Sequence, residues 1–487
     1  MPLQSTLLGG AATSGPTRRN LLLGSLLLPA LALVDSFVPR VRFRKFLLVS
    51  VDTLRFAHVG CFGSPLPTTP ALDALAFEST RFTKAFSACS FTMPSITALL
   101  TSKMPGMGEH LLANGWTMPT LTTPALAQSF ARAGFETAAF VGNYTLRKDA
   151  GLTPGFATYD DDFDSLEATR GVPERRCESL TNAASGWLES NWSKSFFLWL
   201  HYQDPHGPYT PRPPYDTVFV GQEGPLEEIP LLENQSGQGG LPEYQRLGDH
   251  RDLSYYKSQF DGEIAGWDAQ FSRLIATLKK LGIYDETVIV VCADHGEAFG
   301  ERGFYCCHGH GLGPELTRVP LILYVPGSAR AVVGAPVSLL DVAPTMLSLA
   351  RLPVPVDFAG FNLLKAARGS QRPQPVLMET SFAVGAVADS FVFTWGALRT
   401  PSGCPENMKI SDPTRCGFAS GAMELYDLAS DPLGSVDVKA RNAERFRYME
   451  GICREYLSAS TAVYRAHETV SLDETTKSRL RALGYLN

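Results

Sequence analysis

Two strongly apolar runs each end in a short acidic segment, and this pattern constrains the fold more than any other feature. Residues 46–51 lead into Asp52. Residues 287–293 lead in the same way into Asp294 and His295. In open α/β sheets, ligands bind in the crevice beyond the carboxyl ends of the strands, so the two segments can meet there. Two carboxylates and an imidazole indicate a site for a hard divalent cation.

The rest of the chain alternates apolar strand candidates with helical patterns, which indicates the α/β class. The clearest helix is expected over residues 255–280, where apolar side chains recur every three or four positions and Gly282 follows the last lysines. Further strands are expected at residues 137–141, 196–200 and 321–325. Residues 221–250 are rich in Gly, Pro, Glu and Gln, and are expected to form a surface loop.

Length and charge exclude some classes of protein. A chain of 487 residues with 44% hydrophobic content can bury a large core and exceeds one average domain. The formal net charge is -6, and the charges are interspersed without a long basic run. Nucleic acid is therefore not expected as a partner.

The first residues read as a targeting segment. Arg18 and Arg19 precede an apolar stretch that continues to Val34, and Ala30 and Ala32 supply small residues at which a signal peptidase could cut. Residues 1–34 thus resemble a twin-arginine export signal, with an uncleaved membrane anchor as the alternative. Either alternative places the protein outside the cytoplasm, in the periplasm or the extracellular space.

The nine cysteines leave at least one thiol unpaired within a monomer. Cys404 and Cys416 flank a loop and are the best disulfide candidates in an oxidising compartment. Cys306 and Cys307 are adjacent and could bind a soft metal, but an incidental or structural role is favoured. Cys292 lies within an apolar strand and is expected to be a core residue.

Four short motifs occur in order along the chain. They are Asp-Thr-Leu-Arg at 52–55, Thr-Met-Pro-Ser at 92–95, Asp-Pro-His-Gly-Pro-Tyr at 204–209 and Asp-His-Gly-Glu at 294–297. Together they resemble the sulfatase branch of the alkaline phosphatase superfamily, over about residues 45–432. The closing segment 480–485 also looks like the end of many bacterial members.

This resemblance implies a large mixed, mostly parallel sheet sandwiched by helices. The catalytic domain would span residues 45–362. Residues 363–487 would form a smaller C-terminal domain and tail, in which a short antiparallel sheet carries a helix. Strands of that sheet are expected at residues 376–379 and 391–395, and segment 424–428 would close it.

The sequence departs from the family at position 92. Sulfatases have Cys or Ser there, which an activating enzyme converts to formylglycine, whereas this chain has Thr92. The extra methyl group of threonine excludes the aldehyde, so formylglycine is not expected. Phosphate-handling relatives use threonine here, including nucleotide pyrophosphatase/phosphodiesterases, phosphoethanolamine transferases and lipoteichoic acid synthase.

Cationic groups of the sulfatase pocket are also replaced. The Gly-Lys-x-His pattern appears as Gly-Asn-Tyr-Thr at residues 142–145, and the motif arginine is Ile96. A second pocket lysine would fall near Gly309, where the adjacent His308 could take part of its role. The pocket is therefore expected to be less cationic than that of a standard sulfatase.

The resemblance implies one divalent ion, Ca²⁺, Mg²⁺, Mn²⁺ or Zn²⁺. Its expected ligands are Asp52, Asp294 and His295, with Thr92 Oγ coordinating as the attacking alkoxide. Without the resemblance, Thr92 would be read as a helix N-cap, at a short helix opening at Pro94.

The expected catalytic residues are Thr92, His206 and His308, with one of the two histidines protonating the leaving oxygen. Expected substrate contacts come from Asn143, an amide donor, and from two residues with alternatives. His201 is either a substrate contact or a hydrogen-bonded support. Arg55 either holds Asp52 in place or neutralises substrate charge.

These expectations favour a metal-dependent hydrolase that cleaves a sulfate-type or phosphate-type ester through a covalent threonyl intermediate, with a phosphoester preferred. The substrate would be a small molecule or a glycan or lipid ester. Membrane contact is expected only through the N-terminal segment if it remains uncleaved. The alternatives are a phosphoryl-group transferase and a non-catalytic binding protein derived from a sulfatase.

Overall fold

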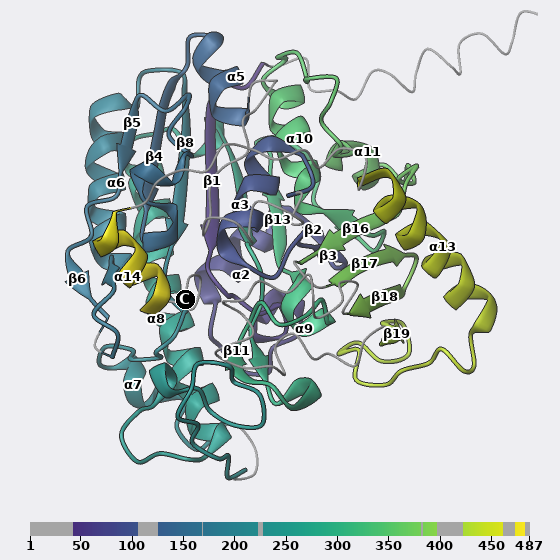
Figure 1. Ribbon diagram of the computed structural model, residues 1–487. Coiled ribbons are helices and arrows are strands. Elements are labelled where there is room, and N and C mark those ends of the chain that lie inside the picture. Colours follow the sequence, from purple (N-terminus) through teal and green to yellow (C-terminus); the bar gives the residue numbers. More distant parts are fainter. Residues whose placement is uncertain are drawn as a thin grey trace, which may run out of the picture. The chain divides into compact units, whose positions relative to one another are not determined.

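A mixed eight-stranded sheet carries the fold in the computed structural model, which describes residues 42–105, 125–167, 169–222, 227–380, 383–396, 422–460 and 473–482 (Figure 1). From one edge to the other the strands are β14 (Ala331–Val333), β2 (Thr80–Phe82), β13 (Leu321–Tyr324), β9 (Thr287–Ala293), β1 (Lys45–Val51), β8 (Phe196–Tyr202), β4 (Glu136–Val141) and β5 (Thr158–Asp160). The neighbours β9, β1, β8, β4 and β5 run parallel, whereas β13 is antiparallel to β9 and to β2.

The α/β prediction and the mostly parallel sheet are confirmed. The apolar runs expected at the centre of the sheet form β1 and β9, and β8 and β9 are buried along their whole length. Such strands need apolar side chains on both faces because helices cover both sides of the sheet. The predicted strand ends differ from the structure by one or two residues, which is ordinary at the ends of elements.

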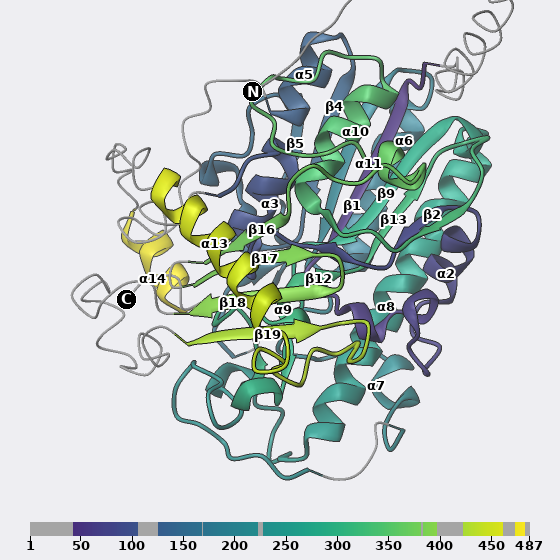
Figure 2. The same ribbon diagram turned by 90° about the vertical axis from the view of Figure 1, so that its right-hand side faces the viewer.

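Two groups of helices cover the sheet (Figures 1 and 2). Helices α2 (Pro70–Phe77), α6 (Cys177–Asn191) and α8 (Leu253–Lys280) pack together on one face, and α3 (Thr92–Thr101), α5 (Leu126–Arg132) and α10 (Val342–Leu349) pack together on the other. Helix α8 begins two residues before the predicted start, because Asp252 caps it by accepting a hydrogen bond from the Ser254 backbone N–H at 3.2 Å.

The apolar stripe of α8 packs in the main core, as its periodicity predicted. Tyr256, Phe260, Trp267 and Phe271 of this helix are fully buried. Burial of each such side chain stabilises the fold by roughly 1.5–3 kcal/mol, so this stripe attaches the helix firmly to the sheet.

A second, four-stranded antiparallel sheet follows the main one in the chain. Its strands are β16 (Val376–Glu379), β17 (Ala383–Ala388), β18 (Phe391–Gly396) and β19 (Met423–Asp427), and helix α13 (Ala443–Ser460) packs on β17 and β18. Val384, Phe393, Leu425 and Met449 form a small core between this helix and the sheet. The smaller antiparallel sheet is therefore confirmed, while the boundary at residue 362 stays a prediction.

The remaining predictions concern the export segment, the cysteines and contact with a membrane. The predicted export segment and the Cys404–Cys416 pair lie outside the described residues. Every element named here belongs to the compact unit that begins at Phe43. None of the helices described is long and apolar enough to cross a membrane. Cys292 is buried in β9, as expected for a core residue.

Candidate functional site

The register of the parallel strands brings the predicted site residues to one edge of the sheet. Val51 of β1 lies opposite Tyr202 of β8 and Ala293 of β9. Asp52 and Asp294 therefore leave neighbouring strands at the same level. The ladder continues into Asp52, whose backbone N–H donates to the Tyr202 carbonyl at 3.0 Å, so the position of this carboxylate is fixed by the sheet itself.

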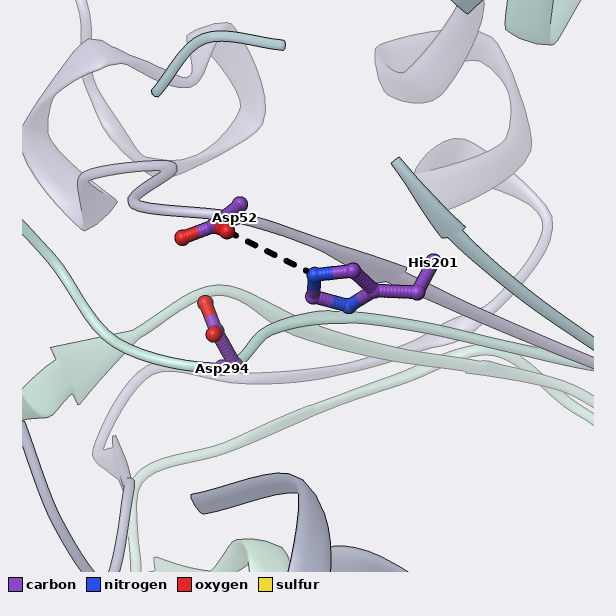
Figure 3. Close-up of side chains that lie close together, drawn as sticks. All are labelled: Asp52, His201 and Asp294. Carbon is purple, nitrogen blue, oxygen red and sulfur yellow. Dashed lines mark ion pairs between the residues drawn. The ribbon is translucent and has the colours of Figure 1, made fainter. Parts of the chain in front are cut away.

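Asp52, Asp294 and His201 form a buried cluster (Figure 3). One ligand atom from each of the three residues lies within 4.8 Å of the other two. The Nε2 atom of His201 is 3.5 Å from Asp52 Oδ2. All three side chains are fully buried and converge on one space, as Figure 3 shows.

The His201 ring is oriented from behind by its own strand and by β1. Its Nδ1 atom lies 2.9 Å from the Ser50 hydroxyl, which also accepts a hydrogen bond from Trp199 Nε1 at 2.9 Å. Nε2 is consequently the nitrogen that faces the carboxylates. Such partners behind an imidazole are common around metal ligands because they fix the ring and its tautomer. The hydrogen-bonded support expected for His201 is present, and the ring also reaches the cluster.

The cluster contains buried polar atoms that lack a hydrogen-bond partner in the described part of the chain. They are Asp52 Oδ1, Asp294 Oδ2 and His201 Nε2. Burying such atoms unpaired costs free energy, and that cost falls when they share a cation. Two carboxylate oxygens and an imidazole nitrogen are suitable donors for a divalent ion, so these residues fit the predicted metal.

The pKa values of the two carboxylates are pushed apart. Burial, and after it the charge of Asp52, raises the pKa of Asp294 well above its usual value. Burial also raises the pKa of Asp52, but the imidazoles of His201, His206 and His295 outweigh it and hold that pKa below its usual value. Two anions this close repel each other, and a bound cation would offset the repulsion.

His295 joins the cluster through its Nε2 atom. This nitrogen lies 3.4 Å from Asp294 Oδ2, 3.7 Å from Asp52 Oδ1 and 3.2 Å from Thr92 Oγ1. The other ring nitrogen lies 2.9 Å from the Gly296 carbonyl, which can only accept, so Nδ1 donates. In the neutral ring the lone pair is therefore on Nε2, toward the cluster. The structure thus brings together all four residues predicted as metal ligands.

Thr92 is the first residue of α3, which starts two residues before the predicted opening at Pro94. The N-cap residue is Phe91, and the alternative in which Thr92 caps the helix is wrong, since its hydroxyl reaches His295 instead. Ser95, in the first turn of α3, donates its hydroxyl hydrogen to the backbone carbonyl of Asp294 at 2.6 Å. This hydrogen bond connects the helix with the end of β9. The positive end of the helix dipole near Thr92 favours an anion there.

Thr53 was missed by sequence reasoning. Its φ of 55° lies in the left-handed region, which is uncommon for a β-branched residue. In this conformation its backbone N–H donates to Asp294 Oδ1 at 3.2 Å and links the ends of β1 and β9. Strain of this kind clusters at functional sites, but no residue type in the sequence signals it.

Two further imidazoles lie beside the cluster. The ring of His308 has its centroid 4.5 Å from that of His295 and 5.2 Å from that of His206. His206 Nδ1 donates to the Gly207 carbonyl at 2.8 Å, and burial lowers the pKa of His206 to about 4. The neutral His206 ring therefore presents the Nε2 lone pair rather than a proton.

Glu297 lies behind His308, and sequence reasoning assigned it no role although it ends a quoted motif. Its Oε1 atom is 3.2 Å from His308 Nδ1, and its Oε2 atom is buried without a hydrogen-bond partner in the described residues. Burial raises the pKa of Glu297 to about 7. This contact orients the His308 ring and directs its Nε2 atom away from Glu297.

Asn143 and Arg55 each have partners within the protein. Asn143 Nδ2 donates to Asp52 Oδ2 at 2.5 Å, and its Oδ1 accepts from the backbone and the hydroxyl of Thr145 at 2.8 and 2.7 Å. One N–H of the predicted amide donor is therefore already used on a candidate metal ligand. Arg55 pairs with Glu301 at 2.7 Å, so its predicted contact with Asp52 is not formed.

A pocket adjoins this cluster. His206, Asn143, Tyr144, Gln203, Arg170 and Glu174 contribute to its wall. Arg170 pairs with Glu167 at 2.7 Å, and Glu174 pairs with Arg176 at 3.3 Å, so much of the charge on the wall is internally balanced. Asn143 links the pocket with the cluster, because it lines the pocket and donates to Asp52.

Comparison with known families identifies the class. The family model described as Sulfatase matches residues 44–352, and the chain therefore belongs to the sulfatase family. Such enzymes are hydrolases of ester bonds. The chain is similar to the uncharacterized sulfatase YidJ of Escherichia coli (strain K12), with 26% identity over 69% of this chain and 72% of that protein. It is also similar to the choline-sulfatase of Rhizobium meliloti (strain 1021), with 25% identity over 77% and 80% of the two chains.

Solved structures agree on the fold. The phosphonate monoester hydrolase of Agrobacterium radiobacter superposes with a TM-score of 0.64 at 20% identity, and the match covers 86% of this chain and 96% of the other. A protein solved with its substrate D-glucosamine-2-N,6-O-disulfate gives a TM-score of 0.66 at 18% identity, over 86% and 98% of the two chains. At this identity the likeness establishes the architecture alone.

Proposed function

We propose that this sulfatase-family hydrolase cleaves a phosphate-type ester through a covalent intermediate on Thr92. The observation that carries the proposal is the approach of Thr92 Oγ1 to His295 Nε2, at 3.2 Å, beside the buried carboxylates. A threonine cannot become formylglycine, so the hydroxyl itself is the nucleophile. Threonine at this position is also what phosphate-handling relatives of the sulfatases use.

Asp52, Asp294 and His295 would hold one divalent cation, with His201 within reach as a further ligand. When bound, that ion supplies positive charge for the oxygens of the ester and favours the ionised nucleophile. Asn143 keeps Asp52 oriented through the bond to Oδ2. The donor set is compatible with Ca²⁺, Mg²⁺, Mn²⁺ and Zn²⁺.

The residues divide the reaction into two displacements. Thr92 Oγ1, its proton lost to solvent, attacks the phosphorus and forms a Thr–O–P bond, while the bond to the leaving oxygen breaks. Water then attacks the same phosphorus and releases Thr92, which regains a proton. The N-terminal end of α3 carries the attacking oxygen and its dipole favours the negative charge of the ester.

Of the two histidines predicted to assist departure, His308 suits the donor role better. Burial raises the pKa of Glu297 to about 7, so its carboxyl group can keep a proton and donate it to His308 Nδ1. This places the proton of the neutral His308 ring on Nε2, where it can pass to the leaving oxygen. His206 suits the opposite role, since its lowered pKa keeps the ring neutral and its Nε2 atom can accept a proton from the attacking water.

The substrate class is inferred from the small number of positively charged side chains in the pocket wall. Neutral Asn143 and Thr145 stand where standard sulfatases have a lysine and a histidine. With fewer cations, the pocket favours a singly charged ester, such as a phosphodiester or a phosphonate monoester, over a doubly charged phosphate monoester. A phosphoester or phosphonate ester of a small molecule, glycan or lipid is favoured. The arginine pair at the amino terminus supports action outside the cytoplasm, after export.

The proposal is tested with the purified full chain, stripped of metal and reloaded with each of the four ions in turn. The probes are 4-nitrophenyl sulfate, 4-nitrophenyl phosphate, bis(4-nitrophenyl) phosphate and 4-nitrophenyl phenylphosphonate. Hydrolysis of a phosphorus ester that needs the ion, together with a phosphoryl group on the peptide containing Thr92 after rapid quenching, would support it. Preferred hydrolysis of the sulfate ester, or undiminished activity of Thr92→Ala, would overturn it.

A further inference from the structure

The last described helix contacts a residue of the pocket wall. Helix α14 (Glu474–Ala482), yellow in Figure 1, places the guanidinium of Arg479 beside Tyr144. Arg479 Nη1 donates to the Tyr144 hydroxyl at 3.4 Å, and its Cζ atom is 5.4 Å from the ring centroid. Arg147 also lies against this ring, with Cζ at 5.0 Å from the centroid. Tyr144 is thus flanked by two cations that come from distant parts of the chain.

Tyr144 belongs to the wall of the pocket that adjoins the cluster. It directly follows Asn143, whose amide holds Asp52. Both residues lie just beyond the carboxyl end of β4, in the segment that connects the sheet edge with the rim of the pocket. A cation that contacts Tyr144 is therefore next to a side chain of the pocket wall.

The arginines near Tyr144 differ in whether a carboxylate pairs with them. Arg147 pairs with Asp149 at 2.6 Å. Arg170 pairs with Glu167 and lies over the ring of Tyr244, with Cζ 4.0 Å from its centroid. Arg479, in contrast, forms no ion pair with a carboxylate of the residues described here, and its recorded partner is the neutral Tyr144 hydroxyl. Its charge is therefore available for a ligand.

We propose that Arg479 binds a second anionic group of the substrate, remote from the ester that is cleaved. The proposal rests on the proposed function and narrows it to esters that carry an additional carboxylate, sulfate or phosphate group. A guanidinium suits this task because its planar set of N–H donors can bind an oxyanion in a bidentate manner. The tail of the chain thereby contributes specificity to a pocket whose wall has lost cationic side chains at Asn143 and Thr145.

The test compares two aryl esters of whichever acid the wild-type enzyme hydrolyses, one with a para-carboxylate and one with a para-carboxamide on the leaving group. Arg479→Gln should raise KM for the carboxylate ester roughly tenfold, which is the usual size of a charge-assisted hydrogen bond, and leave KM for the carboxamide ester nearly unchanged. Arg479→Lys should restore part of the preference. Added salt should reduce the preference in the wild type.

Lys477→Gln is the matched control, because it removes one positive charge from the same helix. Lys477 pairs with Glu474 at 2.7 Å, so its loss should leave both KM values unchanged. If Arg479→Gln altered both esters equally, or neither, Arg479 would be a structural residue and the proposal would be wrong. An equal loss of preference in Lys477→Gln would contradict it as well.

A binding measurement separates this proposal from the proposed function. Titration calorimetry with 4-hydroxybenzoate and 4-hydroxybenzamide needs no catalysis. A wild-type preference for the benzoate that disappears in Arg479→Gln would support the anion site even if the protein hydrolysed none of the esters. A wild type that binds both compounds equally would overturn the anion site, whatever its activity.

Discussion

Thr92 Oγ1 lies 3.2 Å from His295 Nε2, although 203 positions separate the two residues in the chain. One residue opens a helix and the other follows the end of a central strand. Their approach combines the proposed nucleophile with the proposed cation site, and the following predictions depend on it.

Removal of the Thr92 hydroxyl should abolish most of the activity. For Thr92→Ala we expect a loss of several orders of magnitude in kcat, or about 4 kcal/mol or more of barrier, because the covalent route is lost. Thr92→Ser keeps the hydroxyl and should retain much of the activity. Steady-state kinetics on the preferred phosphorus ester, with metal content measured in parallel, would show the difference. A Thr92→Ala variant that stays active while Thr92→Ser does not would refute the assignment.

Asn143→Leu should weaken binding of the divalent ion. The variant removes the N–H that holds Asp52 Oδ2, and loss of a partner behind a metal ligand usually costs about 10–100-fold in affinity. Competition with a chelator of known affinity would measure the change. Asn191→Leu, which alters another buried amide at the end of α6, is the control and should leave metal affinity intact.

Glu297→Gln should reveal whether His308 protonates the leaving group. If it does, kcat should fall by roughly 10²-fold for a substrate with a poor leaving group such as a simple alcohol. The loss should be much smaller for a 4-nitrophenyl ester, because nitrophenolate departs without protonation. His308→Asn should show the same dependence on the leaving group. Equal losses for both kinds of substrate would mean that the Glu297–His308 contact serves only the structure.

His206 should make the protein less stable in mild acid. Burial lowers its pKa from about 6.5 in the unfolded chain to about 4, so the unfolded state binds the proton first as pH falls. The stability is complete above the unfolded value and is lost as pH falls toward 4. Between pH 7 and pH 5 this amounts to about 2 kcal/mol.

Urea unfolding of the wild type and of His206→Gln at both pH values would measure this linkage. The variant should lose less of its free energy of unfolding between pH 7 and pH 5 than the wild type does. Identical pH dependence in the two proteins would contradict a buried, neutral His206.

The sequence predicted those parts of the fold that depend on local pattern. Short stretches of sequence suffice to predict the apolar strands β1 and β9 and the periodic apolar stripe of α8. The structure contains all three elements. Asp52 and Asp294 could be placed together because parallel strands end at a shared edge. The Thr92–His295 contact needed the family resemblance in addition, since Thr92 before Pro94 fits a helix cap equally well.

Other parts of the site depend on contacts that leave no local trace. The orientation of His201 depends on a hydroxyl from the neighbouring strand, supplied by Ser50. The positive φ of Thr53 arises where two strand ends are joined, in a residue type that ordinarily avoids it. The approach of Arg479 to Tyr144 depends on how the final helix packs, over 335 positions of sequence. Such features result from tertiary packing, which periodicity and motif spacing do not encode.

The shared register of β1, β8 and β9 has a consequence for how such a protein can diversify. Because Asp52, His201 and Asp294 are set by the innermost ladder of the molecule, insertions in the outer loops leave their mutual spacing untouched. The proposed anion contact of Arg479 with a substrate, in contrast, lies outside these strands, near Tyr144. Substitutions in the outer loops can thus change the substrate, while the strand-end residues Asp52, His201 and Asp294 keep their positions.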